Sequence, residues 1–333
     1  MRTPGFWSAR SPTWTARLLS PAAVLYGAVA GRRMAQDGVR AALPVICIGN
    51  FTAGGAGKTP TALALATLLR AAGERPAFLT RGHGGRARTP LLVDPAVHDH
   101  RAVGDEPLLL ARAGPTVVSP DRPAGAALAA ATGASLVLMD DGLQNPSLKK
   151  DLALAVVDGE TGIGNGLCLP AGPLRAPLSA QWPFVDGIVL MGRGAAGARV
   201  AAEAERRGVP VFHARLAPDS AIAERLDGAR VLAFAGIGRP EKFFRTLEDC
   251  GATVVERVAL ADHHVYRPGE AEALLAHARA KGLVPVTTEK DAARLPALDG
   301  LLALPVTARL EDPAGLSALL AAALARRRAA DQP

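Results

Sequence analysis

The sequence predicts an α/β fold built on a doubly wound, mostly parallel sheet. Short apolar runs that are rich in β-branched residues alternate with alanine-rich helical stretches along almost the whole chain. These apolar runs are continuous, which is typical of strands covered by helices on both faces. The first run also leads through a glycine-rich turn into a strong helix former, so the chain opens its core with a strand–turn–helix unit.

The expected elements fall into two series. A second, shorter series follows the turn at Asp227-Gly228 and predicts a smaller α/β domain. The core strands are expected at 45–48, 77–80, 116–118, 136–139, 153–157, 187–191 and 209–212, and the second series has strands at 231–235, 253–258 and 284–288 and helices at 240–249, 268–280 and from 313 onwards. We therefore expect an N-terminal helical segment over 1–40, a core over 41–228 and the smaller domain over 229–333.

Composition narrows the class of protein. With 333 residues, of which 49% are hydrophobic, the chain has ample material for a buried core, so a disordered chain is excluded. The formal charge of +7 fits nucleic acid, an anionic membrane surface or phosphorylated substrates, and the sign alone does not choose among them. The cysteines at 47, 168 and 250 are isolated, which suggests neither a disulfide framework nor a zinc site and makes a reducing cytosolic compartment the default.

The first forty residues combine aromatic, apolar and basic side chains. Trp7, Trp14 and Tyr26 surround the apolar run 18–30, which is shorter than the roughly 20 residues of a membrane-spanning helix and contains Pro21. Only Asp37 opposes the arginines that flank the run, namely Arg2, Arg10, Arg17, Arg32, Arg33 and Arg40. Two interpretations are open: an interfacial helix that meets anionic lipid headgroups, and a helix packed on the domain.

The stretch VICIGNFTAGGAGKTP at 45–60 predicts a phosphate-binding loop. Its glycines let the backbone fold into a nest of N–H donors, Lys58 can reach terminal phosphates, and the Thr59 hydroxyl can bind Mg²⁺. The helix that follows adds its positive dipole end. The strict pattern has glycine where this chain has Thr52, and the alternative is an ordinary glycine-rich turn with a surface lysine. The expected nucleotide-binding residues are Thr52, Ala53, Gly54, Gly55, Ala56, Gly57, Lys58 and Thr59.

Three further segments carry candidate chemistry. The strand that ends in Asp140 and Asp141 would place a carboxylate beside a phosphate-bound Mg²⁺, or else simply turn the chain at Asp-Gly. Asp105 lies at the start of an expected helix, where a carboxylate commonly does no more than interact with the helix dipole. Alternatively, either Asp105 or Asp262, together with His263, could supply the base for an alcohol nucleophile.

The basic, glycine-rich stretch RGHGGR at 81–86 follows a strand. It fits an anion-binding loop on the substrate side, and a flexible surface turn explains it equally well.

Together these segments resemble the family of tetraacyldisaccharide 4'-kinases, over nearly the whole chain. The threonine at 52 is itself similar to the family's version of the phosphate loop. The resemblance is carried by GNFTAGGAGKTP at 49–60, TRGHGG at 80–85, GDEP at 104–107, SPDR at 119–122, DDGLQ at 140–144, GNGLCLPAGPLR at 164–175, AGIGRPEKFF at 235–244, ADHH at 261–264 and TTEKDA at 287–292.

The resemblance implies an ATP- and Mg²⁺-dependent kinase that phosphorylates the 4' hydroxyl of an acylated glucosamine disaccharide 1-phosphate. It implies a P-loop core, a smaller C-terminal domain and an N-terminal helix on the cytoplasmic face of the bacterial inner membrane, held there as a peripheral or monotopic protein. The lipid and the anionic membrane surface are the expected partners; no nucleic acid and no obligate protein partner is expected.

The resemblance also assigns roles by motif. It implies Asp105, His263 and Lys58 as catalytic residues, Thr59, Asp140, Asp141 and Glu106 at the metal, and Asn50, Arg81, Arg122, Gln144 and Arg175 toward the substrate. Departures are small: Leu143 stands where the family often has Phe, and His83 where Tyr is common. The doubled histidine leaves open which ring acts, and His263 is chosen because it directly follows Asp262. Rival hypotheses are a P-loop switch or metallochaperone, and a membrane-surface nucleotide-binding module without catalysis.

Overall fold

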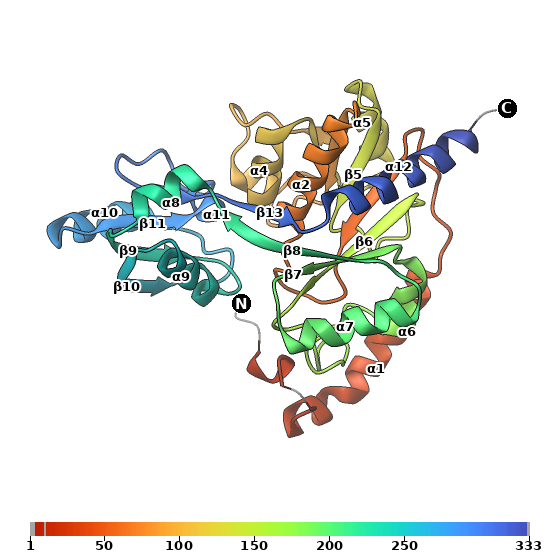
Figure 1. Ribbon diagram of the computed structural model, residues 1–333, viewed down its shortest axis with the longest axis horizontal. Helices are drawn as coiled ribbons and strands as arrows, with labels where there is room; N and C mark the ends of the chain where they lie inside the picture. The colour runs from red at the N-terminus through yellow and green to blue at the C-terminus, as the bar shows by residue number, and fades with distance from the viewer. Residues whose placement is uncertain (1–3, 10, 332–333) are drawn as a thin grey trace.

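The computed structural model describes residues 4–9 and 11–331 (Figure 1). Arg2 and Arg10, two of the arginines of the N-terminal segment, lie outside these residues. Within the described residues, the strands form one nine-stranded and one four-stranded sheet, each with its own hydrophobic core. The chain therefore folds around two separate sheets, as expected for a large α/β core with a smaller α/β domain.

The large sheet is mostly parallel and has β1 near its middle, between β5 and β6. Its short edge strands β3 and β13 pair antiparallel to their neighbours. In spatial order the sheet comprises β13 (Val306–Leu310), β8 (Val211–Pro218), β7 (Gly187–Met191), β6 (Leu152–Asp158), β1 (Val45–Gly49), β5 (Leu136–Asp140), β2 (Pro76–Thr80), β4 (Thr116–Val118) and β3 (Leu91–Leu92).

Helices cover both faces of this sheet because its central strands are apolar on both sides. In β1, the side chains of Val45 and Cys47 enter one core and those of Ile46 and Ile48 enter the other. The first face carries α5 (Arg122–Ala131), α6 (Leu178–Gln181) with the 3₁₀ turn Trp182–Phe184, and α7 (Ala195–Arg206), and the second carries α2 (Lys58–Ala71), α4 (Asp105–Ala113) and α12 (Pro313–Ala329). The short helix α3 (His100–Val103) precedes α4 directly.

The smaller domain repeats this architecture on a reduced scale. Its parallel sheet has one face against α8 and α9 and the other against α10. The sheet order is β10 (Thr253–Ala259), β9 (Arg230–Ala235), β11 (Val284–Thr288) and β12 (Leu302–Leu304), and the helices are α8 (Ser220–Leu226), α9 (Pro240–Asp249), α10 (Glu270–Ala280) and α11 (Glu289–Ala292).

The domain limits differ from the sequence-based expectation at both ends of the smaller domain. We expected 229–333 to form it, but β13 pairs with β8 and α12 packs on α2, so the chain after β12 returns to the large sheet. Conversely, α8 lies before residue 228 and places Leu226 in the core of the smaller domain. The error arose because helical and strand propensity are local and do not specify which sheet an element joins.

Two antiparallel strands connect the domains. The strand expected at 209–212 is β8, which starts at Val211 and continues to Pro218. Figure 1 shows β8 and β13 running side by side from the large sheet toward the smaller domain, and five residue pairs join them. The chain thus leaves and re-enters the core along one ribbon.

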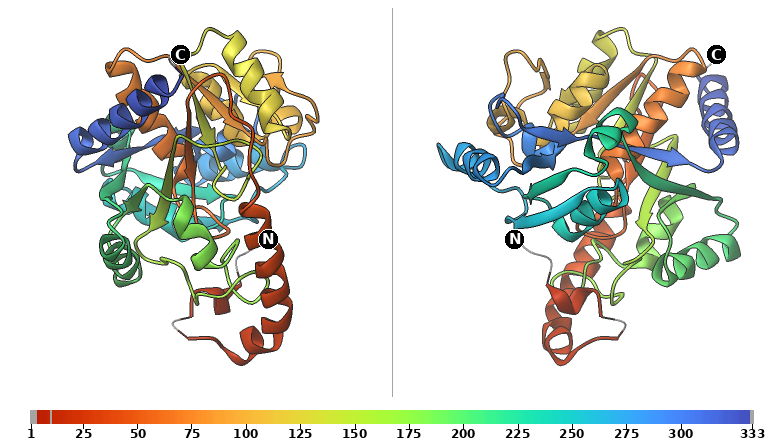
Figure 2. Two further views of the ribbon diagram at one scale, coloured as in Figure 1. Left: turned by 90° about the vertical axis from the view of Figure 1, so that its right-hand side faces the viewer. Right: turned by 60° about the vertical axis from the view of Figure 1, so that its left-hand side comes forward.

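The N-terminal helix α1 (Trp14–Met34) packs along one side only. It contacts α6, and its Gly27 lies so close to Cys168 that an added Cβ would be 3.1 Å from Sγ. The opposite side is exposed and apolar, and Figure 2 shows α1 projecting from the rest of the molecule. Although Pro21 lies inside it, the helix is continuous. Among the described residues, no helix is long and apolar enough to cross a membrane.

Packing of α12 on the core generates a stability prediction. Leu320 is 2% exposed in the core formed with α2, so Leu320→Ala should lower the free energy of unfolding of the large domain by about 2–5 kcal/mol. Urea unfolding followed by circular dichroism measures the loss. Leu18→Ala, at an exposed position on α1, serves as the control and should change it by less than about 0.5 kcal/mol. Equal unfolding curves for Leu320→Ala and the unmodified protein would contradict the placement of α12.

Candidate active site

The glycine-rich loop connects the carboxyl end of β1 to the first residue of α2. Gly54 and Gly57 have φ angles of 117° and 93°, which side chains with a Cβ rarely adopt. Within the described residues, the backbone amides of 54–57 donate to no other backbone group. These amides and the amino end of α2 therefore form an anion-binding cradle at the position where β1, with neighbours on both sides, meets the helix.

Thr52 fits this loop although the strict motif has glycine there. Its φ is not positive, and it forms a β-bridge with Leu174. The next residue, Ala53, donates its backbone N–H to the carbonyl of Pro173 over 2.7 Å. The segment 173–175 thus holds the start of the loop by backbone contacts. No glycine is needed at position 52, because the φ angle there is not positive.

Asn50 and Gln144 also support the loop. The Asn50 amide donates to the carbonyl of Gly54 over 3.2 Å, and the Gln144 amide donates to the carbonyl of Asn50 over 2.7 Å. Asn50 is buried, and Gln144 also contacts the side chain of Gln181. We expected both residues toward the substrate, whereas these contacts place them under the loop.

Lys58 points back toward the acidic end of β5. Its Nζ lies 3.6 Å from Oδ1 of Asp141, which also accepts a hydrogen bond from Nη1 of Arg175 over 2.7 Å. Although burial opposes ionisation of Asp141, Lys58 and Arg175 lower its pKa to about 2. Asp141 is thus an anion that holds two cations next to the phosphate loop.

Asp140 is a buried carboxyl group with no partner. It is 1% exposed, and neither of its oxygens has a hydrogen-bond partner among the described residues. Burial, followed by the neighbouring charge of Glu106, raises the pKa of Asp140 to about 7. Such an orphaned carboxylate, on the strand next to β1 and near Lys58 of the phosphate loop, fits a divalent cation.

The described residues include no group of three or more His, Cys, Asp or Glu side chains that could hold a metal ion by themselves. A cation here would therefore share its ligands with bound phosphate, which is the usual situation for Mg²⁺ in nucleotide sites.

Asp105 and His263 meet across the two domains. Asp105 begins α4 and is buried, and its Oδ2 lies 3.5 Å from Nδ1 of His263, in the loop after β10. The hydrogen bond that the His263 ring donates to Asp105 is the main cause that raises the pKa of His263. His264 faces elsewhere, because its Nε2 lies 2.8 Å from the carboxylate of Glu270. Of the two adjacent histidines, His263 is therefore the one that contacts Asp105.

The loop after β2 packs tightly against the residues before Asp105. A Cβ at Gly85 would lie 2.6 Å from the Val103 backbone, and one at Gly104 would lie 2.6 Å from the carbonyl oxygen of His83. The ring of His83 is 5.4 Å from that of His263. The loop is thus a packed wall of the site instead of a loose surface turn.

Sequence reasoning missed two basic residues from the smaller domain. Lys290 in α11 pairs with Glu106, and Arg294, directly after α11, pairs with Asp105. Burial opposes ionisation of Glu106, but Lys290 and then Lys58 lower its pKa. The TTEKDA segment at 287–292 was one signal for Lys290, whereas Arg294 had none. Both pairs join residues more than 180 positions apart.

A second group of ion pairs also joins the two domains. Asp158, at the end of β6, accepts from Lys242 over 2.7 Å and from Arg239, which also donates to the carbonyl of Gly55 in the phosphate loop. In every ion pair between the two domains that the described residues form, the smaller domain supplies the cation and the core the anion. The cations are Arg239, Lys242, Arg245, His263, Lys290 and Arg294, and the anions are Asp105, Glu106, Asp158 and Glu160.

The three arginines expected toward the substrate do not share one environment. Arg81 is exposed after β2, Arg175 pairs with Asp141, and Arg122 is 2% exposed at the start of α5. Burial lowers the pKa of Arg122, and its Nε has no hydrogen-bond partner among the described residues. Arg81 is the most exposed of the three.

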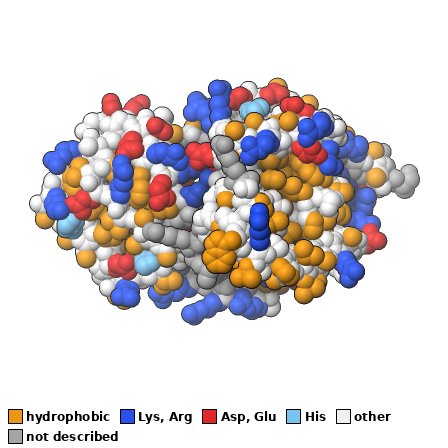
Figure 3. Space-filling model, turned by 90° about the horizontal axis from the view of Figure 1, so that it is seen from below, with side chains coloured by type: hydrophobic (Ala, Val, Ile, Leu, Met, Phe, Trp, Pro, Cys, Tyr) orange, Lys and Arg blue, Asp and Glu red, His pale blue; other side chains and the backbone are white. Residues whose placement is uncertain are grey.

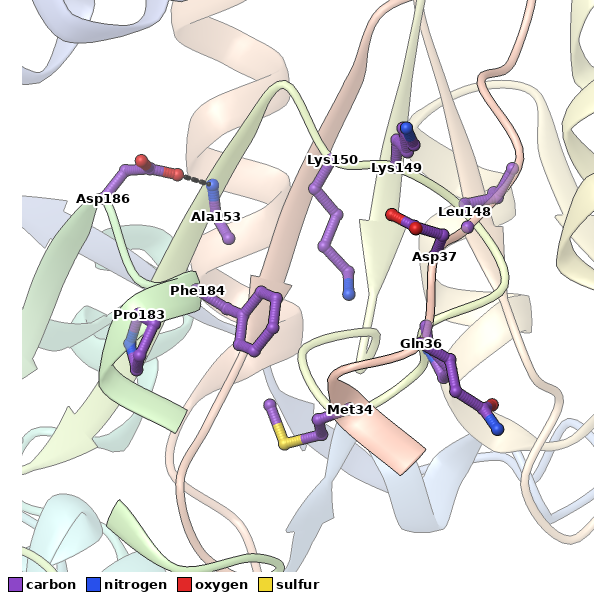
Figure 4. Close-up of a pocket in the computed structure, with 12 residues that line it drawn as sticks. Met34, Gln36, Asp37, Leu148, Lys149, Lys150, Ala153, Pro183, Phe184 and Asp186 are labelled. Atoms are coloured by element: carbon purple, nitrogen blue, oxygen red, sulfur yellow. Dashed lines mark hydrogen bonds between the residues drawn. The ribbon is translucent and has the colours of Figure 1, made fainter. Parts of the chain in front are cut away.

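A separate pocket of about 340 Å³ lies away from these residues (Figure 4). Met34 at the end of α1, Phe184 and Lys150 line it, and Asp186 bonds the backbone of Ala153 near the start of β6. It therefore opens at the amino end of β6, whereas the phosphate loop lies at the carboxyl end of β1. Chemistry at the loop does not involve this pocket.

Comparisons with known proteins agree with this arrangement. Residues 15–325 match the family model described as tetraacyldisaccharide-1-P 4'-kinase. Similar proteins include the tetraacyldisaccharide 4'-kinases of Methylobacterium sp. (strain 4-46), 58% identical over 98% of this chain and 99% of that protein, and of Methylorubrum extorquens (strain PA1), 61% identical over 89% and 90%.

A solved structure is similar as well. The crystal structure of LpxK from Aquifex aeolicus in complex with ATP aligns with a TM-score of 0.72 and 25% identity, over 93% of this chain and 99% of that one. The likeness confirms the α/β fold with a mostly parallel sheet that the sequence predicted.

The orphaned carboxyl of Asp140 generates a prediction about pH. Because its pKa in the folded protein, about 7, exceeds its usual 3.8, ionisation costs stability increasingly as the pH rises between these values. Asp140→Asn removes this cost. In EDTA without nucleotide, the variant should melt about 2–5 °C above the unmodified protein at pH 8 and with little difference at pH 4, near the usual pKa of the carboxyl group. Thermal unfolding followed by fluorescence measures both.

The same variant should lose affinity for Mg²⁺-ATP, measured by calorimetry, because one proposed ligand of the cation is gone. Asp299→Asn, at an exposed position, is the matched control for both measurements. A melting temperature of Asp140→Asn at or below that of the unmodified protein at pH 8 would show that Asp140 is paired in solution.

Proposed function

This chain belongs to the tetraacyldisaccharide-1-P 4'-kinase family, and from this premise we propose how its residues act. The chain is an ATP-dependent kinase of lipid A biosynthesis. The acceptor is the 4' hydroxyl of a tetraacylated glucosamine disaccharide 1-phosphate. What remains to be assigned is which side chains hold ATP, activate the hydroxyl and bring the lipid to the site.

The phosphate loop holds the nucleotide. Free amides at 54–57 and the dipole of α2 face the phosphates, and Lys58 moves from Asp141 toward the phosphoryl oxygens. Positioning and neutralisation of charge supply most of the acceleration in phosphoryl transfer. Support for this assignment comes from the loop's geometry and from the ATP complex of the similar kinase of Aquifex aeolicus.

Mg²⁺ fits the carboxylate of Asp140 and the hydroxyl of Thr59, with Glu106 and Asp141 at the margin of the site. Asp140 is favoured because its oxygens have no other partner among the described residues. Glu106 and Asp141 already pair with Lys290 and with Lys58 and Arg175. When bound, the cation would neutralise charge on the phosphate oxygens.

Asp105 and His263 prepare the nucleophile. As the hydroxyl oxygen attacks the γ-phosphorus in line, its proton passes to this pair and the β,γ-bridging oxygen leaves with ADP. The observation that carries this proposal is the contact between Asp105 and His263. The next residue, Glu106, has a pKa that Lys290 and then Lys58 of the phosphate loop lower. Residues from both domains must therefore be in place for transfer.

The candidates for recognition of the lipid are the arginines at 81, 122 and 175. Arg81 is exposed at the end of β2, next to the loop of His83, where it can meet the 1-phosphate of the disaccharide. Arg175 could join it only by leaving Asp141, and Arg122 only by becoming exposed. We rank Arg81 first for this reason.

The two adjacent histidines provide a matched test of the mechanism. His263→Ala should lower kcat by about 10²–10⁴-fold, because the proton acceptor is lost, while the Kd for ATP stays within about twofold. Transfer of labelled phosphate from ATP to tetraacyldisaccharide 1-phosphate measures kcat, and equilibrium binding of ATP measures Kd.

His264→Ala is the control and should keep nearly full activity, since that ring contacts Glu270 and not Asp105. Asp105→Ala should abolish transfer without loss of ATP affinity. Full activity of His263→Ala or Asp105→Ala would refute the assignment and show that another group takes the proton.

We also propose that α1 rests on the anionic cytoplasmic face of the inner membrane. Its exposed side carries large apolar residues, and Arg32 and Arg33 lie in its last turn. Figure 3 shows hydrophobic side chains gathered, with basic ones among them, on the side of the molecule where α1 projects. The apolar residues of this surface are Trp14, Leu18, Val24, Leu25, Tyr26 and Val29.

A charge placed on this surface should weaken membrane binding. Leu25→Asp introduces a carboxylate at a position that is 69% exposed, and we expect about tenfold or more weaker partitioning onto vesicles that contain phosphatidylglycerol. Sedimentation with the vesicles measures partitioning. Val97→Asp, at a position 74% exposed elsewhere, is the control and should bind like the unmodified protein. Unchanged sedimentation of Leu25→Asp would rule out α1 as the contact.

A further inference from the structure

Arg294 lies directly behind the Asp105–His263 pair. Its side chain is 5% exposed and donates to Oδ2 of Asp105 through Nε, over 3.1 Å, and through Nη2. Its Nη1 donates to the carbonyl of Gly236 over 2.9 Å and to Asp291 over 3.1 Å. One guanidinium thus joins the core carboxylate to the backbone of the smaller domain.

The guanidinium is itself held in place. Asp291, which is fully buried, accepts hydrogen bonds from the Thr288 hydroxyl over 2.6 Å, from the Tyr266 hydroxyl over 3.0 Å and from the backbone N–H of Gly236. Among the residues that the structure describes, every polar contact of Asp291 thus comes from the smaller domain. A buried network whose hydrogen bonds are satisfied is rigid. Arg294 is therefore held in one orientation, and it holds the Asp105 carboxylate in turn.

The contacts of Asp105 leave it little capacity to take a proton itself. Its Oδ1 accepts the backbone N–H of Glu106 over 3.0 Å, and its Oδ2 is shared by Arg294 and His263. Asp105 is therefore placed to orient its neighbour, because Arg294 and His263 already share its Oδ2.

The ring of His263 is the group that this arrangement presents to the cleft. Its Nδ1 lies 3.5 Å from Oδ2 of Asp105 and 3.4 Å from Nη2 of Arg294, as expected when two donors share one acceptor. A proton on Nδ1 leaves the lone pair of Nε2 free. Nε2 lies 3.9 Å from Asp262, outside hydrogen-bond range, so it can accept a proton from a ligand.

We propose that Arg294 is a positioning residue that fixes Asp105 so that His263 presents Nε2 to the 4' hydroxyl. This inference rests on the proposed function and deepens it. In the step, the O–H bond of the sugar breaks and an N–H bond forms at Nε2. The oxygen's electron pair forms the new bond to the γ-phosphorus, and the electrons of the broken P–O bond leave with ADP. His263 then returns its proton to water.

Chemical rescue tests the proposal. Arg294→Ala should lower kcat by about 100-fold, because Asp105 and the ring lose their alignment, with KM for ATP and lipid within about twofold. Guanidinium chloride at tens of millimolar should restore at least a tenth of the lost activity, whereas sodium chloride at the same ionic strength should not. Arg279→Ala removes an arginine of α10 that donates to the carbonyl of Asp299, away from Asp105, so this variant is the matched control and should be fully active.

A double-mutant cycle separates positioning from a general structural role. If Arg294 acts through His263, the double variant Arg294→Ala with His263→Ala is no slower than His263→Ala alone. The proposal is overturned if the kcat losses of the two single variants multiply in the double variant, or if a folded Arg294→Ala has normal kcat. It is also overturned if guanidinium fails to rescue an Arg294→Ala variant that melts like the unmodified protein.

If Arg294→Ala fails to fold, the kcat of Arg294→Lys tests the proposal instead. The lysine keeps the charge but lacks the planar fork, so kcat should fall about tenfold at unchanged KM, and normal kcat would overturn the proposal. These outcomes differ from failure of the proposed function itself. If His263 is not the proton acceptor, His263→Ala remains active, whichever residue stands at position 294.

Discussion

Attraction between opposite charges across the domain cleft is the constraint on which the site depends. The core contributes carboxylates at the ends of its strands and helices, and the smaller domain contributes the arginines, lysines and the histidine that face them. Neither half would be stable as a buried surface alone, since an unpaired buried charge is costly. Because β8 and β13 form the ribbon between the domains, these pairs set how the domains face each other at the nucleotide.

The same charge distribution suits the chemistry. A nucleotide brings several negative charges next to Asp105, Glu106, Asp140 and Asp141, which would repel it in the absence of compensation. Lys58 and Arg175 lie against Asp141, Lys290 lies against Glu106, and Arg294 lies against Asp105. Asp140 alone among the four has no cationic or hydrogen-bonding partner in the described residues. The site thus stores an electrostatic cost at the one position where a divalent cation would remove it.

The elements of the fold were largely predictable because the signal for each is local. Continuous apolar runs identified the central strands, and 116–118, 187–191 and 284–288 were placed without error. The short edge strands β3, β12 and β13 were missed, since two to five residues of mixed exposure carry no clear period. The helix from Pro313 was expected, but its assignment to the smaller domain was wrong, because long-range pairing decides which sheet receives it.

By itself the sequence indicated the phosphate loop and the acidic strand end, because backbone dihedrals, helix dipoles and side-chain chemistry depend on nearby residues. The pair of Asp105 and His263 was implied only by the resemblance to the kinase family, since the residues alone left Asp262 as an alternative. Tertiary structure alone decided that His263 rather than His264 faces Asp105, that Asn50 and Gln144 support the loop, and that Arg294 joins the pair. These outcomes depend on contacts between residues far apart in the chain, where distance and burial, which no local pattern encodes, fix the role of each side chain.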